Sequence, residues 1–123
     1  MPGDLLRAEN VTRGQTLAAR VTCADGMLAR MRGLIGRPPL AAGAGLLIEP
    51  CSGIHTWFMG FAIDVVFVDA AGRVIAALGP IPPWRLTRLY PHATAALELP
   101  PGTVAATGTA AGDRIEFAAT PGA

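Results

Sequence analysis

The sequence has 123 residues, of which 51% are hydrophobic and 15% are charged, and its formal net charge is +1. This length suits one domain with its own core, and the apolar composition excludes an intrinsically disordered chain. The balanced charge creates no long-range field that would favour nucleic acid or acidic partners. No apolar run reaches the roughly 20 residues that a transmembrane helix needs. We therefore expect neither a nucleic-acid partner nor a membrane partner.

The N-terminus lacks the basic and then apolar layout of a secretory signal peptide. We therefore expect a cytoplasmic protein, although a leader removed before Met1 would leave the same sequence. Cys23 and Cys51 allow one disulfide at most, and in a cytoplasmic domain we expect both thiols to be reduced. All ten basic residues are arginine, which excludes chemistry that depends on lysine.

The first half of the chain contains two predicted strands and the one predicted helix. Residues 1–14 are polar and have no sustained period, which predicts a loosely ordered lead-in to a single β-rich domain over residues 15–123. Residues 15–22 alternate as a strand does. The helix is predicted from Asp25, whose carboxylate suits an N-cap, and it ends before a Pro-Pro pair. Residues 46–48 fit a short buried strand.

A β-hairpin is the clearest local prediction. Residues 62–68 alternate between two faces, and residues 73–78 form the return strand. The four residues from Asp69 to Gly72 begin with Asp and end with Gly, which is typical of a type I turn followed by a glycine bulge.

The last third predicts three more strands. Residues 84–90 suit an edge strand, which could pair two chains. Residues 93–99 are predicted as a strand because Pro-Pro-Gly follows them, and residues 113–118 form the last one. About seven short strands, one short helix and a turn every eight to twelve residues indicate a mainly β (α+β) fold, either an antiparallel β-sandwich or a partly closed barrel.

Asp64 interrupts an apolar strand, and burying its carboxylate without a partner would cost several kcal/mol. One interpretation is an ion pair with Arg30, Arg32 or Arg37, or a cap on backbone N–H groups. The other is a polar anchor at the rim of a ligand pocket. That pocket would be lined by His55, Trp57, Phe58 and Met59.

Cys51 and His55 are separated by three residues, and this spacing supports three hypotheses. The thiolate and imidazole could share a metal ion, with His92 and Asp64 completing the ligand set. They could also act as nucleophile and base in a hydrolase-like enzyme, with Asp64 orienting the imidazole. The third interpretation is a buried thiol beside a histidine that hydrogen-bonds to the backbone.

Two further groups could bind a ligand or serve the fold. Arg30, Arg32 and Arg37 could hold an anion through their guanidinium groups, or they could complement a helix end and remain solvated. The aromatic residues around Trp57 and Phe61 could stack on a ring, or they could belong to the core.

Seven short blocks connect the chain to a known family. They are R-M-R-G-L-I-G-R at 30–37, G-L-L-I-E-P-C at 45–51, I-H-T-x-x-M at 54–59, I-D-V-V-F-V-D at 63–69, G-R-V at 72–74, L-E-L-P-P-G at 97–102 and G-D at 112–113. In these blocks the chain resembles the domain of unknown function 192 (DUF192) family of small bacterial and archaeal proteins. The resemblance covers residues 25–117 and implies a compact, mostly β domain with one short helix and no established activity. Met59 matches the family methionine, whereas the Lys and Asn that follow it in many members are absent here.

We expect a stand-alone β-rich domain that binds a small ligand or a protein partner and requires no cofactor. An enzyme that uses Cys51, His55 and Asp64 is the first alternative, and a metal-binding protein is the second. The sequence leaves the reaction, the ligand and the oligomeric state open. The predicted ligand-binding residues are His55, Thr56, Met59, Asp64, Arg30, Arg32 and Arg37.

Overall fold

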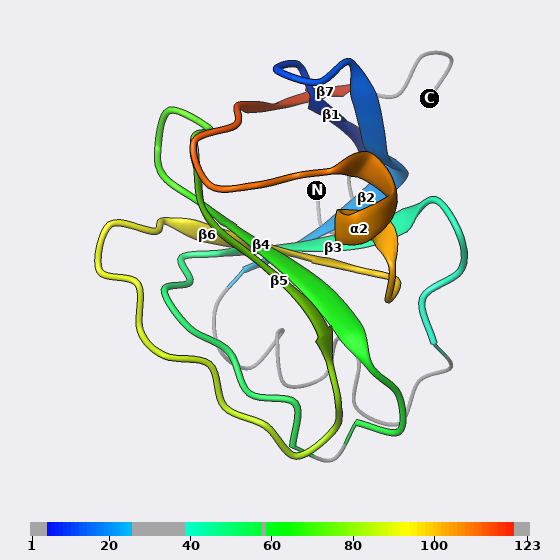
Figure 1. Cartoon of the computed structure of the whole chain (residues 1–123), viewed down its shortest axis with the longest axis vertical. Helices are drawn as coiled ribbons and strands as arrows, with labels where there is room; N and C mark the ends of the chain where they lie inside the picture. The colour runs from blue at the N-terminus through cyan, green and yellow to red at the C-terminus, as the bar shows by residue number, and fades with distance from the viewer. Residues whose placement is uncertain (1–4, 26–38, 58, 120–123) are drawn as a thin grey trace.

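The computed structural model describes residues 5–25, 39–57 and 59–119. These residues form a mainly β domain with one short helix, which confirms the expected fold class (Figure 1). In the described ranges, no helix has the length and apolar character needed to cross a bilayer. The elements are β1 (Leu5–Asn10), β2 (Gln15–Asp25), β3 (Ala44–Glu49), β4 (Ile63–Val68), β5 (Val74–Ile81), β6 (Ala95–Leu99), α2 (Thr103–Thr107) and β7 (Ile115–Ala119).

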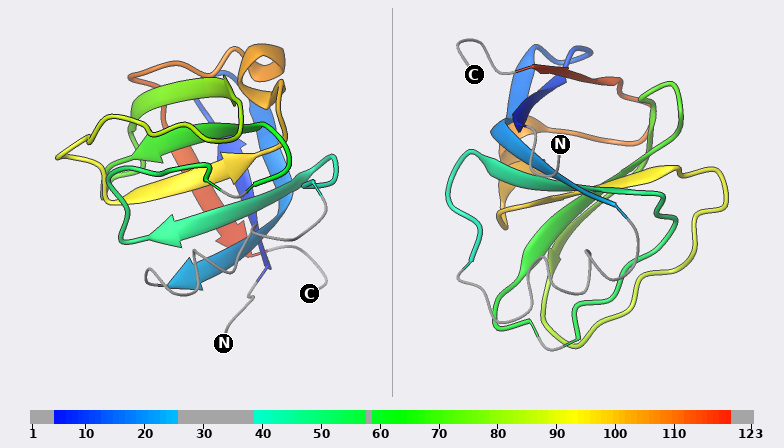
Figure 2. Two further views of the ribbon diagram at one scale, coloured as in Figure 1. Left: turned by 90° about the horizontal axis from the view of Figure 1, so that it is seen from below. Right: turned by 180° about the vertical axis from the view of Figure 1, so that it is seen from behind.

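All seven strands belong to one sheet in the order β5-β4-β6-β3-β2-β1-β7. Neighbouring strands are antiparallel except β2 and β3, which are parallel. The sheet curls so that its two edge strands approach each other at one end (Figures 1 and 2). There Arg73 and Arg114 form an isolated bridge, and Val74 N donates to Asp113 O at 2.7 Å. The result is a half-barrel that is closed only near the β4–β5 turn.

The predicted hairpin is confirmed as β4 and β5. Asp69 Oδ1 accepts hydrogen bonds from the N–H groups of Ala71 and Arg73, both at 2.9 Å. Gly72 has φ +83° and donates to Asp69 O at 3.0 Å. A residue other than glycine rarely adopts this φ, so the turn depends on the Asp and Gly that the sequence places at its two ends.

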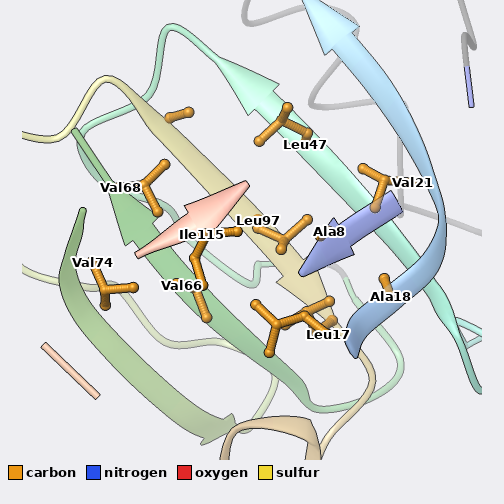
Figure 3. Close-up of a cluster of buried hydrophobic side chains, with 12 residues drawn as sticks. Ala8, Leu17, Ala18, Val21, Leu47, Val66, Val68, Val74, Leu97 and Ile115 are labelled. Carbon is orange, nitrogen blue, oxygen red and sulfur yellow. The ribbon is translucent and has the colours of Figure 1, made fainter. Parts of the chain in front are cut away.

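Hydrophobic side chains cover both faces of the sheet at β4 and β6. The inner face points into the half-barrel, where Val66, Val68 and Leu97 pack with residues from β1, β2 and β7 (Figure 3). The outer face carries a second core around Ile63, Val65 and Phe67. Every residue of β4 and β6 is buried, which explains why both strands read as nearly continuous apolar runs.

Two long connections cover the outer core. One joins β3 to β4 through residues 50–57 and 59–62, and the other joins β5 to β6 through residues 82–94. They run side by side in Figures 1 and 2, and we call them the cover loops. Their inward side chains include Cys51, Ile54 and Met59, which belong to the outer core.

Two predictions about strands were wrong. One strand was missed and one was predicted in error, so the total of seven strands in the described residues is still the expected one. Residues 5–10, expected within a loosely ordered lead-in, form β1 between β2 and β7. Residues 84–90, expected as an edge strand, contribute only the isolated bridge of Leu86. Prolines flank this segment, and Trp84 has φ +64°, which interrupts an extended backbone.

The helix prediction has two outcomes. Asp25, the expected N-cap, is the last residue of β2, and the remainder of the expected helix lies outside the described residues. Helix α2 was not predicted, because five residues are too few to show a helical period. Gly102 and Gly108 bound it with φ +95° and +70°.

Candidate functional site

The cover loops pair with each other as a short, irregular ribbon. His55 and Leu86 face each other across it as an antiparallel bridge. The hydrogen bonds of the ribbon run from Thr56 N to Arg85 O at 2.8 Å, from Thr87 N to Ile54 O at 2.9 Å and from Tyr90 N to Ser52 O at 2.8 Å. This pairing fixes which side chains point to the outer core and which point to solvent.

Thr56, predicted to bind ligand, is fully buried and fastens the two loops together. Its hydroxyl lies 2.7 Å from Pro82 O, to which it donates, and it accepts from Arg85 N at 2.8 Å. Buried hydroxyl groups are normally satisfied in this way, so these contacts account for Thr56 without a ligand. Met59 is also buried, within the outer core.

His55 and Trp57 lie on the opposite side of the ribbon from Ile54 and Thr56. The His55 and Trp57 rings stack with centroids 4.9 Å apart and an angle of 30° between their planes. His55 Nδ1 also accepts a hydrogen bond from Trp57 N at 3.3 Å. The imidazole therefore helps to hold an exposed indole on the outer surface.

Trp84 has an unusual backbone beside these rings. Its φ of +64° makes it the only residue other than glycine with a positive φ among the described residues. Its N–H donates to Thr56 O at 3.0 Å, and its side chain is 58% exposed. A bulky residue in this region is strained, and such strain is found most often at functional sites.

The same loops expose aliphatic and positively charged side chains. Leu86 is 70% exposed and Leu89 is 69% exposed. Arg85 and Arg88 are also exposed, and the Arg88 guanidinium lies 5.6 Å from the centre of the Tyr90 ring. The cover loops contain no Asp or Glu. We call this surface the tryptophan face, and it comprises His55, Trp57, Trp84, Arg85, Leu86, Arg88 and Leu89.

Asp64 lies away from the tryptophan face. It is 1% exposed and shares the inner face of β4 with Val66 and Val68, whereas Met59 packs on the outer face. Asp64 Oδ2 accepts a hydrogen bond from Val104 N in helix α2 at 2.8 Å. Its Oδ1 makes no hydrogen bond within the described part of the chain. The structure therefore does not bring Asp64 together with His55, Thr56 and Met59.

Gly79 is the close neighbour of the Asp64 carboxylate. A β-bulge in β5 brings it opposite Asp64, and a Cβ atom added at Gly79 would overlap Asp64 Oδ1. Gly79 also has φ +152°. This close approach requires glycine and leaves no room for a ligand atom between the two residues.

Cys51 is buried in the outer core, and its Sγ donates to Gly53 O at 3.2 Å. Because Asp64 points to the other face of β4, the described residues do not assemble Cys51, His55 and Asp64 into one site. No group of three or more His, Cys, Asp or Glu side chains in the described ranges could hold a metal ion. The remaining predicted residues, Arg30, Arg32, Arg37 and Phe58, lie outside the described residues.

The sequence did not reveal a buried polar network at the closed end of the half-barrel. Asp113 Oδ2 accepts hydrogen bonds from Arg13 Nε at 2.6 Å, Asn10 Nδ2 at 2.9 Å and Ala110 N at 3.0 Å. The bond from Arg13, helped by the other two, lowers the pKa of Asp113 from 3.8 to about 2. Asn10 also donates to Thr109. This network joins β1 to the loop before β7, so we assign it to the fold.

A groove of about 450 Å³ lies between β2 and α2. It is lined by alanine, glycine, proline, leucine and threonine side chains and by no charged residue. The hydroxyls of Thr103 and Thr107 donate to the carbonyls of Pro100 and Thr103, both at 2.8 Å. The groove therefore presents little that would select a ligand.

The sequence identifies the family of this chain. The model of the DUF192 family, described as "Uncharacterized ACR", matches residues 8–117. This chain belongs to the DUF192 family. The DUF192 chain is 32% identical over 111 residues to the UPF0127 protein PF1050 of Pyrococcus furiosus, covering 88% of this chain and 95% of the relative. It is 32% identical over 113 residues to a UPF0127 protein of Thermococcus sibiricus, covering 88% and 72%.

Two crystal structures share the fold of this DUF192 chain. A protein of Sinorhizobium meliloti 1021, named a candidate transcription regulator, matches with a TM-score of 0.75 and 23% identity over 91% of each chain. A protein of unknown function from Novosphingobium aromaticivorans DSM 12444 matches with a TM-score of 0.77 and 21% identity, covering 91% of this chain and 83% of the other. At these identities the likeness concerns the fold alone.

Proposed function

We propose that this DUF192 protein is a binding module that docks a protein partner on the tryptophan face. The observation that carries the proposal is the position of the exposed apolar side chains. Five large hydrophobic residues are exposed in the described ranges, and four of them lie in the cover loops. Scattered exposed hydrophobic residues are normal, but a group on one surface is typical of an interaction site. The four are Trp57, Trp84, Leu86 and Leu89.

The kinds of residue on this face also support protein docking. Tryptophan and arginine are enriched among the residues that dominate binding energy at protein interfaces. The tryptophan face combines two indoles with two arginines. Trp84 holds a bulky side chain, 58% exposed, on a backbone with φ +64°, a conformation that favours glycine.

Docking explains the geometry better than catalysis or a small-molecule site. Catalysis by Cys51, His55 and Asp64 would need three groups that the fold separates between a buried core, an outer surface and an inner face. The groove beside α2 is open to a ligand but carries no charged group. Among the surfaces formed by the described residues, the tryptophan face combines exposure, aromatic area and charge.

The test is site-specific photo-crosslinking in the cells that make the protein. A photoreactive amino acid replaces Leu86 or Leu89 in turn. The matched control places it at Val11, the one exposed large hydrophobic residue that the structure describes outside the cover loops. We expect a discrete heavier adduct from Leu86 and Leu89, which is lost in Trp84→Ala. The Val11 position should give no such adduct.

Two results would contradict the proposal. One is the absence of an adduct from both leucine positions when the photoreactive protein is folded and present at its normal level. The other is the same set of adducts from Val11, because this would report random collisions instead of a docking surface.

A further inference from the structure

We infer that the partner presents an extended segment in which acidic side chains alternate with apolar ones. This inference rests on the proposed function and specifies the chemistry of the docked segment. It is carried by the charge, the apolar area and the backbone edge of the tryptophan face, which are independent features of the cover loops.

Charge is distributed unevenly along the sequence, although the whole chain is nearly neutral. Residues 50–63 and 70–97 contain no Asp or Glu, whereas both arginines of the tryptophan face are exposed. The net charge of +1 hides this local positive character. Complementary charge on a partner sets the orientation and rate of association, so Arg85 and Arg88 favour an acidic segment.

Leu86 and Thr87 separate these two arginines along the chain, and Trp84 and Leu89 flank them. In the sequence W-R-L-T-R-L, from Trp84 to Leu89, each arginine is followed directly by a leucine. Leu86 and Leu89 expose more of their side chains than any other large hydrophobic residue described. A partner that buries them needs apolar side chains close to its acidic ones.

The backbone at Leu86 favours an extended partner. Hydrogen bonds from Thr56 N to Arg85 O and from Thr87 N to Ile54 O flank the His55–Leu86 pair. His55 and Leu86 therefore form a non-hydrogen-bonded pair of an antiparallel ladder. The N–H and C=O groups of Leu86 therefore point to the outer edge of the ribbon, and they make no hydrogen bond in the described part of the chain. An added strand would satisfy them.

The same features argue against two other occupants. A second copy of this chain, placed by a two-fold axis, would bring Arg85 and Arg88 of one copy close to those of the other. An anionic bilayer would attract the arginines but would offer no regular backbone to pair with Leu86. A protein segment accounts for the charge and the open edge together.

The test uses intrinsic fluorescence, because both tryptophans of the chain lie on this face. The probes are a short capped peptide that alternates glutamate with leucine and a matched peptide with lysine in place of glutamate. We expect the glutamate peptide to change the fluorescence, and we expect its binding to weaken when salt is added. The double variant Arg85→Glu/Arg88→Glu should bind it about tenfold more weakly and should prefer the lysine peptide. Arg114→Glu, at another exposed arginine, should bind as the wild type does.

The outcomes separate this inference from the proposed function. Binding of both peptides alike, binding of neither, or no effect of the double reversal would overturn the acidic segment, even if crosslinks from Leu86 uphold docking. A fluorescence change with phosphatidylglycerol vesicles and with neither peptide would overturn it in favour of a membrane surface. Loss of the Leu86 crosslinks would remove the proposed function as well.

Discussion

The two sides of the sheet at β4 and β6 differ in which polar and apolar groups they bury and which they expose. On the inner side, Asp64 and Asp113 are buried, and backbone or side-chain donors of the chain itself hold them. On the outer side, Thr56 is buried between the cover loops while both tryptophans remain exposed. The carboxylates are buried and hold the fold together, whereas the indoles of Trp57 and Trp84 are 44% and 58% exposed. Asp64, which the sequence singled out as a possible ligand anchor, therefore lies on the inner face, and the candidate site lies on the cover loops, where the sequence predicted an edge strand at residues 84–90.

The largest expected effect concerns the inner face at Gly79. Gly79→Ala places a Cβ atom against the Asp64 carboxylate and forces alanine into a glycine conformation, so we expect about 3 kcal/mol of destabilisation or more. Urea unfolding measures the change. Gly60→Ala is the control, because an added Cβ there meets nothing within 4 Å. Equal stability of the two variants would show that the Gly79 contact is not required.

The next effect concerns Asp113, which accepts three hydrogen bonds. Asp113→Ala should destabilise the protein by about 2 to 3 kcal/mol at neutral pH, because the buried Asn10 amide loses an acceptor and the half-exposed Arg13 loses its ion-pair partner. The folded pKa of about 2 lies below the ordinary 3.8, so the stabilisation by the ionised carboxylate is complete above 3.8 and is lost as the pH falls through 2. Urea unfolding at several pH values should therefore show that the difference in unfolding free energy between wild type and variant decreases in acid. A difference that stays constant with pH would contradict a stabilising role for the ionised Asp113 carboxylate.

A smaller effect is expected at Asp64. Asp64→Ala removes the acceptor for Val104 N and should destabilise the protein by about 1 to 2 kcal/mol, since it also removes an oxygen that has no partner in the described chain. Fluorescence binding of the glutamate peptide should not change, because Asp64 lies on the inner face. Loss of binding in a folded variant would mean that the two faces are coupled.

The smallest effect on stability is expected on the tryptophan face itself. Leu86→Ser and Leu89→Ser should each change the free energy of unfolding by less than about 0.5 kcal/mol, because both side chains are mostly exposed. Val11→Ser is the matched control. Only the two leucine variants should weaken peptide binding. A large loss of stability would instead assign the leucines to the fold of the cover loops.

The local parts of the fold could be predicted from the sequence. The β4–β5 hairpin follows from strand alternation and from Asp69 and Gly72 at the turn, and β6 follows from its apolar run before Pro-Pro-Gly. Strand β1 was missed because residues 5–10 show no sustained alternation, although it forms a hairpin with β2, and its other partner, β7, is distant in sequence. The contact between Asn10 and Asp113 spans 103 residues. No local pattern reports such a pairing.

The candidate site was predicted only in part. His55 was named, but the exposure of Leu86 and Leu89 depends on how the two cover loops cross the sheet, which alternation alone does not determine. The carboxylate of Asp64 was recognised as needing a partner, and that partner is the backbone of α2, a helix too short to predict.

The backbone of Trp84 has a consequence for how this protein would respond to selection for heat resistance. Alanine normally stabilises a chain more than glycine does, but at φ +64° the order should reverse, with Trp84→Gly more stable than Trp84→Ala by about 1 kcal/mol. A laboratory search for thermostable variants would therefore tend to replace this tryptophan with glycine. Such a variant would lack the indole that we propose the tryptophan face presents to a partner.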